Sequence, residues 1–300
     1  MSQLLPDLNA PLAELENFSN VGIIITDLDG TFVKQDGDVL GQLKGIQSQF
    51  SYHAITITIA TGRTYIGAQE IANQMKIKKG TPLALYNGAV VLTYHTNSIL
   101  FHETIPFSVL QELCTFIDWE QQYILAYCLS GSGHNIVETV HGFGSHTLEK
   151  DINGMEILWH SKDDLENLSF GGSLFSQDYE PCSILIDWKL LGNRAESVAQ
   201  YLEQCPLISC TRSGNVFWEI RANGVNKGII FKYFGNDTRC IAIGDNDNDI
   251  ELLQKADIGV VVANGSSAAK AVAQYHCRES GASGVLELVR TIKEATRYFG

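Results

Sequence analysis

The sequence lacks the features that mark membrane and secreted proteins. No stretch of its 300 residues approaches the run of about 18 apolar residues that a membrane helix needs. Residues 1–20 contain Asp7, Glu14 and Glu16 but neither Lys nor Arg, which is the wrong charge for a signal or transit peptide. The 7 cysteines form no Cys-x-x-Cys pair, which favours reduced thiols over disulfides or a zinc site. We therefore expect a cytoplasmic protein with no membrane partner.

Basic residues are also scarce. The chain has 21 Lys and Arg against 34 Asp and Glu, and its net charge of −13 argues against the basic stripes that nucleic-acid binding needs. Residues 92–220 hold 5 basic and 17 acidic side chains, a net of −12, whereas the rest of the chain has a net of −1. This concentration indicates that residues 92–220 form an inserted domain. The sequence leaves the oligomeric state open.

The hydrophobic pattern predicts an α/β fold around a doubly wound parallel sheet. Apolar strands at 23–26, 54–60 and 82–86 alternate with helical spacing, and the alternation resumes after Gly224. We therefore assign 21–91 and 221–300 to one Rossmann-like core and 1–20 to a lead-in. Residues 92–220 contain locally paired strands and helices, which predicts an α+β cap domain inserted into that core.

The first strand ends in Asp27-Leu-Asp29-Gly-Thr31. Side chains alternate along a strand, so Asp27 and Asp29 should point to the same side, where two like charges repel without a cation or a proton between them. Mg²⁺ prefers such oxygen ligands and usually also binds a substrate phosphate. The alternative interpretation is an ordinary acidic turn at a strand end.

Other polar residues follow later elements of the same sheet. Thr61 follows the second strand, Lys227 opens a helix after the insert, and Asp245 with Asn248 and Asp249 follows a later strand. The carboxyl ends of parallel strands lie on one edge of a sheet, so these residues should share a crevice with Asp27 and Asp29.

This set of side chains suits phosphoryl transfer. The carboxylate of Asp27 can attack phosphorus and form an aspartyl-phosphate, while Mg²⁺ between Asp27 and Asp245 reduces the charge repulsion. Lys227 and Thr61 would hold phosphate oxygens. Asp29 can protonate the leaving oxygen and later accept a proton from the hydrolytic water.

Four segments resemble the four motifs of the haloacid dehalogenase superfamily, in the family's order. They are Asp27-Leu-Asp29-Gly-Thr31, Ala60-Thr61-Gly62-Arg63, Gly224-Val-Asn-Lys-Gly228 and Gly244-Asp245-x-x-Asn248-Asp249. The long insert, preceded by Tyr86-Asn87-Gly88-Ala89, is similar to the cap of Cof-like and sugar-phosphate phosphatases.

The resemblance implies a Mg²⁺-dependent phosphatase of small phosphorylated metabolites. Its catalytic residues would be Asp27, Asp29, Thr61 and Lys227. The substrate would be bound by Thr61, Gly62, Arg63, Asn87, Gly88, Lys227 and Asn248. Mg²⁺ would be held by Asp27, the backbone carbonyl of Asp29, Asp245 and Asp249. The sequence departs from the family pattern at Asp247, which adds a carboxylate to the last motif.

Two alternatives remain open at this point, and a third fails. A phosphomutase or phosphotransferase could use the same core and retain the phosphoryl group. A receiver-type signalling module also forms an aspartyl-phosphate, but it lacks the second carboxylate and needs no large insert. A calcium loop starting at Asp245 fails because Ile250 and Ala256 stand where Gly and a bidentate Glu are required.

The acidity of the cap bears on the substrate. A net charge of −12 would repel carboxylates and additional phosphates within the screening length of about 8–10 Å. We therefore expect neutral or cationic leaving groups, such as sugars or polyols, rather than multiply anionic ones.

Overall fold

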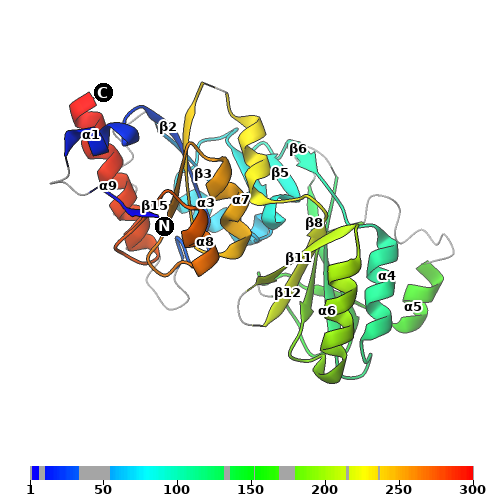
Figure 1. Ribbon diagram of the computed structural model, residues 1–300. Coiled ribbons are helices and arrows are strands. Elements are labelled where there is room, and N and C mark those ends of the chain that lie inside the picture. The colour runs from blue at the N-terminus through cyan, green and yellow to red at the C-terminus, as the bar shows by residue number, and fades with distance from the viewer. Residues whose placement is uncertain are drawn as a thin grey trace.

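A computed structural model describes residues 2–6, 11–33, 55–131, 136–151, 153–168, 180–213, 216–235 and 237–299 (Figure 1). The helix predicted from the spacing of apolar residues between the first two strands lies outside the described residues. In Figure 1 the elements from both ends of the chain gather on one side, and the elements from the middle of the chain form a second body beside them.

A parallel sheet forms the centre of the first body. Its strand order is β1-β15-β14-β13-β2-β3, and each neighbouring pair is parallel. The strands are β1 (Gln3–Leu4), β2 (Val21–Thr26), β3 (Thr56–Ile59), β13 (Arg239–Gly244), β14 (Ile258–Val261) and β15 (Tyr275–His276).

The sheet is covered on both faces because its central strand is apolar on both sides. Ile24 packs into one hydrophobic cluster with residues of α3 and α9, whereas Ile23 and Ile25 pack into another with residues of α7 and α8. These helices are α3 (Tyr65–Gln74), α7 (Ile250–Lys255), α8 (Ser267–Val272) and α9 (Ala282–Phe299). The prediction of a doubly wound α/β core is confirmed.

The lead-in contributes more structure than its sequence indicated. β1 extends the sheet by pairing with β15, while α1 (Leu12–Leu15) and the short 3₁₀ helix η1 (Glu16–Phe18) pack against α9. The ring of Phe18 meets that of Tyr275 edge-on, with their centroids 5.0 Å apart. The edge of the sheet is therefore built from residues near both ends of the chain.

The segment after β3 forms the expected third parallel strand only in part. β4 (Pro82–Leu85) joins the parallel sheet only through a bridge between Ala60 and Ala84. It pairs antiparallel with β5 (Val90–Thr93), which in turn pairs with β6 (Ile99–His102). The predicted boundary between residues 91 and 92 thus falls inside β5, because the hydrogen bonds of this hairpin continue past it. The extent of the cap stays a prediction.

The second body contains a six-stranded sheet in the order β11-β12-β10-β7-β8-β9, antiparallel except between β8 and β9. The strands are β7 (Tyr123–Ser130), β8 (Val137–Gly144), β9 (Ile157–His160), β10 (Pro181–Asp187), β11 (Ile208–Ser213) and β12 (Phe217–Ala222). The helices are α4 (Phe107–Phe116), α5 (Lys162–Leu168), η5 (Gly192–Arg194) and α6 (Ala195–Gln204).

The two faces of this sheet pack on different parts of the molecule. Ile124 and Ala126 point into a cluster with residues of α4 and α6, which lie side by side in Figure 1. The alternate residues Leu125 and Tyr127 belong to the cluster that continues into the core. The predicted α+β architecture of this region is confirmed, and its sheet turns one face toward the core.

The remaining short elements carry motif residues. They are η2 (Tyr86–Gly88), η6 (Lys227–Tyr233) and η7 (Asp247–Asp249). Lys227 opens a helix as predicted, and this helix is of the 3₁₀ type. Within the described part of the chain, no helix combines the length and the apolar character needed to cross a membrane.

Candidate active site

Asp27 follows β2 directly and stays tied to the sheet. Its backbone N–H donates to the carbonyl of Ile243 at 3.0 Å, so the residue continues the pairing between β2 and β13. Asp27 is 4% exposed, whereas the side chain of Asp29 is 58% exposed. The two carboxylates of the first motif therefore lie in different environments.

Lys227 joins two buried carboxylates. Its Nζ donates to Asp27 Oδ1 and to Asp249 Oδ1, each at 2.6 Å, and the residue is 1% exposed. The side chain of Asn226 accepts a hydrogen bond from the backbone of Gly228 and so caps the start of η6. The lysine of the third motif is thus held next to the carboxylate of the first.

The loop after β13 brings in Asp245. Asp249 Oδ2 accepts hydrogen bonds from the backbone N–H groups of Asp245 at 2.9 Å and Asn246 at 3.0 Å, which fixes the loop. Thr31 Oγ1 donates to Asp245 Oδ1 at 2.7 Å. At Gly30, whose φ is +87°, a Cβ would lie 2.3 Å from Asp245 Oδ2. In the first motif, Gly30 therefore leaves room for the carboxyl group of Asp245, and Thr31 holds it by a hydrogen bond.

Asp247, the departure from the family pattern, lies apart from this cluster. It is exposed, and its Oδ1 accepts a hydrogen bond from Ser266 Oγ at 2.7 Å. The structure gives it the solvated surface position that charge runs usually have.

Three carboxylates form a group that suits a metal ion. One oxygen each from Asp27, Asp245 and Asp249 lie within 4.8 Å of one another. Hard divalent cations such as Mg²⁺ take oxygen ligands of this kind. Both oxygens of Asp249 already accept hydrogen bonds, so Asp27 and Asp245 are the better ligands and Asp249 supports the loop. The side chain of Asp29 is outside the group, and a contribution of its backbone carbonyl stays a prediction.

The crowding of these groups changes their pKa values. Burial raises the pKa of Asp27 well above its usual value, and the charges of Asp249 and Asp245 act in the same direction against Lys227. Burial likewise raises the pKa of Asp245 to about 6. Burial alone would lower the pKa of Lys227, but the carboxylates of Asp249 and Asp27 outweigh it and raise that pKa. Lys227 alone does not balance the three carboxyl groups, and a divalent cation would supply the missing positive charge.

Arg63 of the second motif pairs with Asp29. Its Nε donates to Asp29 Oδ2 at 2.8 Å, and its second terminal nitrogen donates to Oδ1 at 2.5 Å. The hydrogen bond to Asp29 raises the pKa of Arg63. The pair is bidentate and partly exposed, so Asp29 is in contact with the solvent side of the site while Asp27 faces Lys227.

A cavity of about 660 Å³ lies between the two bodies and opens over Asp27, Asp29 and Asp245. Of the predicted substrate-binding residues, Gly62, Arg63 and Asn248 line it. The others lie behind its surface and are buried, namely Thr61, Asn87, Gly88 and Lys227. Gly88, with φ +96°, lets η2 approach the loop before Lys227, since a Cβ there would lie 2.2 Å from the carbonyl oxygen of Asn226. Their roles in binding stay predictions.

The cap side of the cavity contains residues that sequence reasoning did not single out. They include Tyr127, Ser183, Leu185, Arg212, Phe217 and Glu219. Glu219 is 5% exposed, and its Oε1 accepts a hydrogen bond from Asn87 Nδ2 at 2.6 Å. A single acidic residue in the apolar run of β12 was the available signal, but its partner is 132 positions away.

A second carboxylate of the cap contacts the core. Glu138 of β8 accepts hydrogen bonds from the backbone N–H groups of Tyr65 at 2.6 Å and Ile66 at 2.9 Å, at the start of α3. It also accepts one from the hydroxyl of Tyr86 at 2.6 Å. Glu138 thereby fastens the cap to the helix that follows the second motif.

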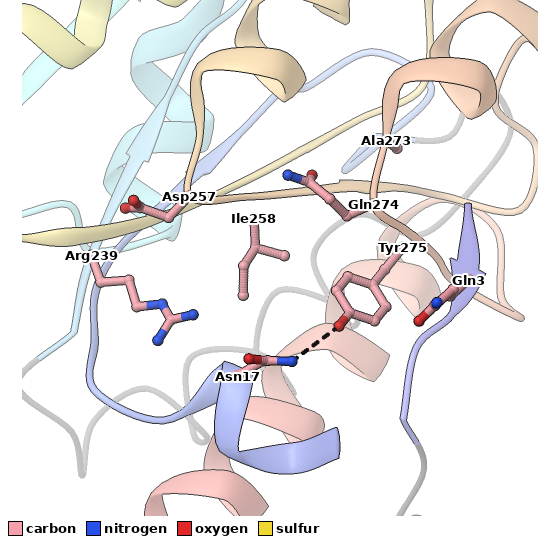
Figure 2. A pocket seen from close by; sticks show the side chains of 8 residues that line it. All are labelled: Gln3, Asn17, Arg239, Asp257, Ile258, Ala273, Gln274 and Tyr275. Atoms are coloured by element: carbon pink, nitrogen blue, oxygen red, sulfur yellow. Dashed lines mark hydrogen bonds between the residues drawn. The ribbon is translucent and has the colours of Figure 1, made fainter. Parts of the chain in front are cut away.

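Another cavity, of about 410 Å³, lies elsewhere on the core (Figure 2). It is lined by Gln3, Asn17, Arg239, Asp257, Ile258, Ala273, Gln274 and Tyr275, and Asn17 donates to the hydroxyl of Tyr275 at 3.5 Å. Asp257 and Arg239 flank the amino end of β13, opposite the end that carries Asp245. None of the predicted site residues lines this cavity.

Comparison with known proteins finds a match to one protein family. The sequence profile of haloacid dehalogenase-like hydrolases matches residues 24–289. The 5-amino-6-(5-phospho-D-ribitylamino)uracil phosphatase YitU of Bacillus subtilis is 26% identical over 284 residues, 89% of this chain and 96% of that protein.

Two solved structures share the fold. A haloacid dehalogenase-like hydrolase from Bacteroides thetaiotaomicron is 22% identical with a TM-score of 0.66, over 91% of this chain and 99% of that one. The subclass IIB sugar phosphatase BT4131 is 18% identical with a TM-score of 0.62, over 93% of this chain and 99% of that one. At this level of identity the likeness concerns the fold alone.

Proposed function

Because the chain belongs to the family of haloacid dehalogenase-like hydrolases and is a phosphatase of that family, like its curated relatives, we propose that it hydrolyses small phosphorylated sugars or polyols with Mg²⁺ bound. The observation that carries the proposal is the position of Asp27. This carboxylate is buried at the end of β2, 2.6 Å from Lys227 and beside Asp245, and it borders the 660 Å³ cavity. Such a site can bring a phosphate to a nucleophile away from bulk water.

Asp27 would act as the nucleophile. One of its oxygens attacks phosphorus, the bond from phosphorus to the leaving oxygen breaks, and that oxygen takes a proton from Asp29. Water then attacks the aspartyl-phosphate, Asp29 takes the proton of the water, and phosphate leaves Asp27. Lys227 compensates the negative charge around Asp27 during both steps.

Asp29 needs to leave Arg63 before it can carry a proton. In the bidentate pair both of its oxygens accept N–H bonds from Arg63, so neither is free to contact a leaving oxygen or a water. A substrate phosphate in the cavity offers Arg63 an alternative anionic partner. We propose that Arg63 turns to the phosphate and frees Asp29 for proton transfer.

Mg²⁺ would be held by Asp27 and Asp245, with Asp249 supporting the loop, and would offset the charge of the phosphate oxygens. Gly30 and Thr31 keep Asp245 in place for this task. The carbonyl of Asp29 is the further ligand that the sequence motif predicts.

The proposed substrate class rests on the cap. The net charge of −12 in residues 92–220 opposes leaving groups that carry further negative charge. The names of YitU and BT4131 point to a phosphorylated ribityl compound and to sugar phosphates. The leaving groups of such esters are rich in hydroxyls. We propose a cytoplasmic location, which suits the free thiols of all 7 cysteines.

A screen of phosphorylated metabolites for released inorganic phosphate tests this proposal. We expect release with Mg²⁺, no release after EDTA, and recovery when Mg²⁺ is restored. Simple hexose and polyol phosphates should be preferred over esters with additional phosphates or carboxylates. Isomerised phosphate esters without free phosphate would indicate a phosphomutase instead, and efficient turnover of multiply anionic esters would contradict the substrate class.

A further inference from the structure

A chain of three polar side chains runs from the cap to the loop of the fourth motif. Asn87 Nδ2 in η2 donates to Glu219 Oε1 in β12 at 2.6 Å, and Asn248 Nδ2 in η7 donates to Asn87 Oδ1 at 3.0 Å. We call these three side chains the amide relay. They come from three distant segments of the sequence, and all lie at the cavity or directly behind it.

Glu219 sets the direction of the amide relay. A carboxylate only accepts hydrogen bonds, so Asn87 must turn its NH₂ group to Glu219 and its oxygen to Asn248. Asn248 must then turn its own NH₂ group to Asn87. Glu219 is 5% exposed and Asn87 is 1% exposed, and Arg221, on the same face of β12, places a buried cation nearby.

The far end of the amide relay is an acceptor without a donor. Asn248 Oδ1 is buried and makes no hydrogen bond to any described residue. Asn248 also lines the cavity together with Asp29 and Asp245. A hydrogen bond to a buried acceptor that has no other donor is stabilising. A phosphate dianion has only acceptor oxygens, so the matching group on a phosphate ester is a hydroxyl of its leaving group.

We infer that Glu219 is a positioning residue for substrate selection, which acts through Asn87 to make Asn248 an acceptor for a hydroxyl of the leaving group. This inference rests on the proposed function and deepens it. Phosphate esters with a hydroxyl near the phosphate bind productively because they pair with Asn248, whereas esters without hydroxyls leave that oxygen buried and unpaired.

Glu219→Gln tests the inference because a glutamine can donate as well as accept. Its NH₂ group can donate to Asn87 Oδ1, which allows both amides to turn over and directs an N–H of Asn248 toward the cavity. The probes are ribitol 5-phosphate and n-pentyl phosphate, which share a chain length and differ in their hydroxyls. We expect kcat/KM for ribitol 5-phosphate to fall about tenfold or more, and that for n-pentyl phosphate to change by less than about threefold.

Asn248→Leu is a second route to the same result. It removes the acceptor while leaving Glu219 and Asn87 in place, so the preference for ribitol 5-phosphate should fall as in Glu219→Gln. Glu203→Gln makes the same chemical change at an exposed position of α6 and should keep the wild-type preference. Thermal unfolding of each variant checks that it is folded.

Two failures can be told apart. If the wild-type protein with Mg²⁺ releases phosphate from neither ester nor from other phosphate monoesters, the proposed function is wrong and the inference falls with it. If the wild-type protein hydrolyses both esters but Glu219→Gln and Asn248→Leu keep its preference, or lose activity equally on both, only the inference is wrong.

Discussion

The two sides of the 660 Å³ cavity are built from different chemistry. On the core side, buried Lys227 donates hydrogen bonds to the buried carboxyl groups of Asp27 and Asp249, each at 2.6 Å. On the cap side, Leu185 and Phe217 offer partly exposed apolar surface. The core side thus suits a small ionic group, and the cap side suits the variable remainder of a substrate.

This difference separates reaction from selection. Charges on the core side favour one bound species because a buried ion requires a partner of opposite charge. Apolar and hydroxyl groups on the cap side discriminate more weakly, by contact area and by individual hydrogen bonds. Substitutions on the cap side can therefore alter substrate specificity without disturbing the core. This requires that the contacts of Glu138 and Glu219 keep the cap bound to the core.

Asp27→Asn gives the sharpest test of the core side. We expect loss of phosphate release on the order of 10⁴-fold or more, because an amide cannot replace the nucleophilic carboxylate. Lys227 keeps its hydrogen bond to Asp249, so the variant should remain folded. Phosphate release measured beside circular dichroism checks both expectations, and near-normal activity would contradict the mechanism.

Asp29→Asn is the matched comparison within the same motif. The side chain of Asp29 is exposed and would act only in proton transfer, so the expected loss is about 10²–10⁴-fold. A larger loss for Asp29→Asn than for Asp27→Asn would exchange the roles assigned to the two carboxylates.

Glu138→Gln tests how firmly the cap is held to the core. An amide cannot accept at both oxygens from Tyr65, Ile66 and Tyr86 as the carboxylate does. We expect the free energy of unfolding to fall by about 1–3 kcal/mol, the usual cost of disrupting a buried charged hydrogen bond. Urea denaturation measures this change. Glu156→Gln, at an exposed position of the cap, should leave stability unchanged, and an equally stable Glu138→Gln protein would rule out the fastening role.

The smallest expected effect is a pH dependence of stability in the metal-free protein. The pKa of Asp245 is raised from 3.8 to about 6 in the folded state. The folded protein therefore holds a proton that the unfolded chain has lost, so this contribution to stability is complete below about pH 4 and is lost as the pH rises through about 6. Asp27 shifts in the same direction.

Thermal unfolding across this pH range, with EDTA and with Mg²⁺, measures the effect. We expect the metal-free protein to lose stability as the pH rises, and Asp245→Asn to flatten that trend. Mg²⁺ should also flatten it, because a bound cation favours the ionised carboxylates. The same slope in the wild-type protein and in Asp245→Asn would show that Asp245 does not titrate as stated.

Much of the core could be predicted from local patterns. The apolar run of β2 and the alternation of strands with helices require a parallel sheet, and a parallel sheet brings its strand ends to one edge. That rule was enough to place Asp27, Lys227 and Asp249 together, although they lie up to 222 positions apart in the sequence. The lead-in was harder to predict, because β1 has 2 residues and forms only against β15.

The tertiary structure decided what the motif residues touch. Sequence spacing put Asp27 and Asp29 on one side of a strand, but packing buried the first against Lys227 and left the second with Arg63. It also placed Glu138 and Glu219 of the cap against core residues, contacts that no local pattern encodes. The spacing of apolar residues indicates the order of strands and helices along the chain. A hydrogen bond between distant side chains depends instead on how the folded elements pack together. The sequence by itself therefore determined the chemistry of the core, and only the folded protein shows which side chains of the cap contact it.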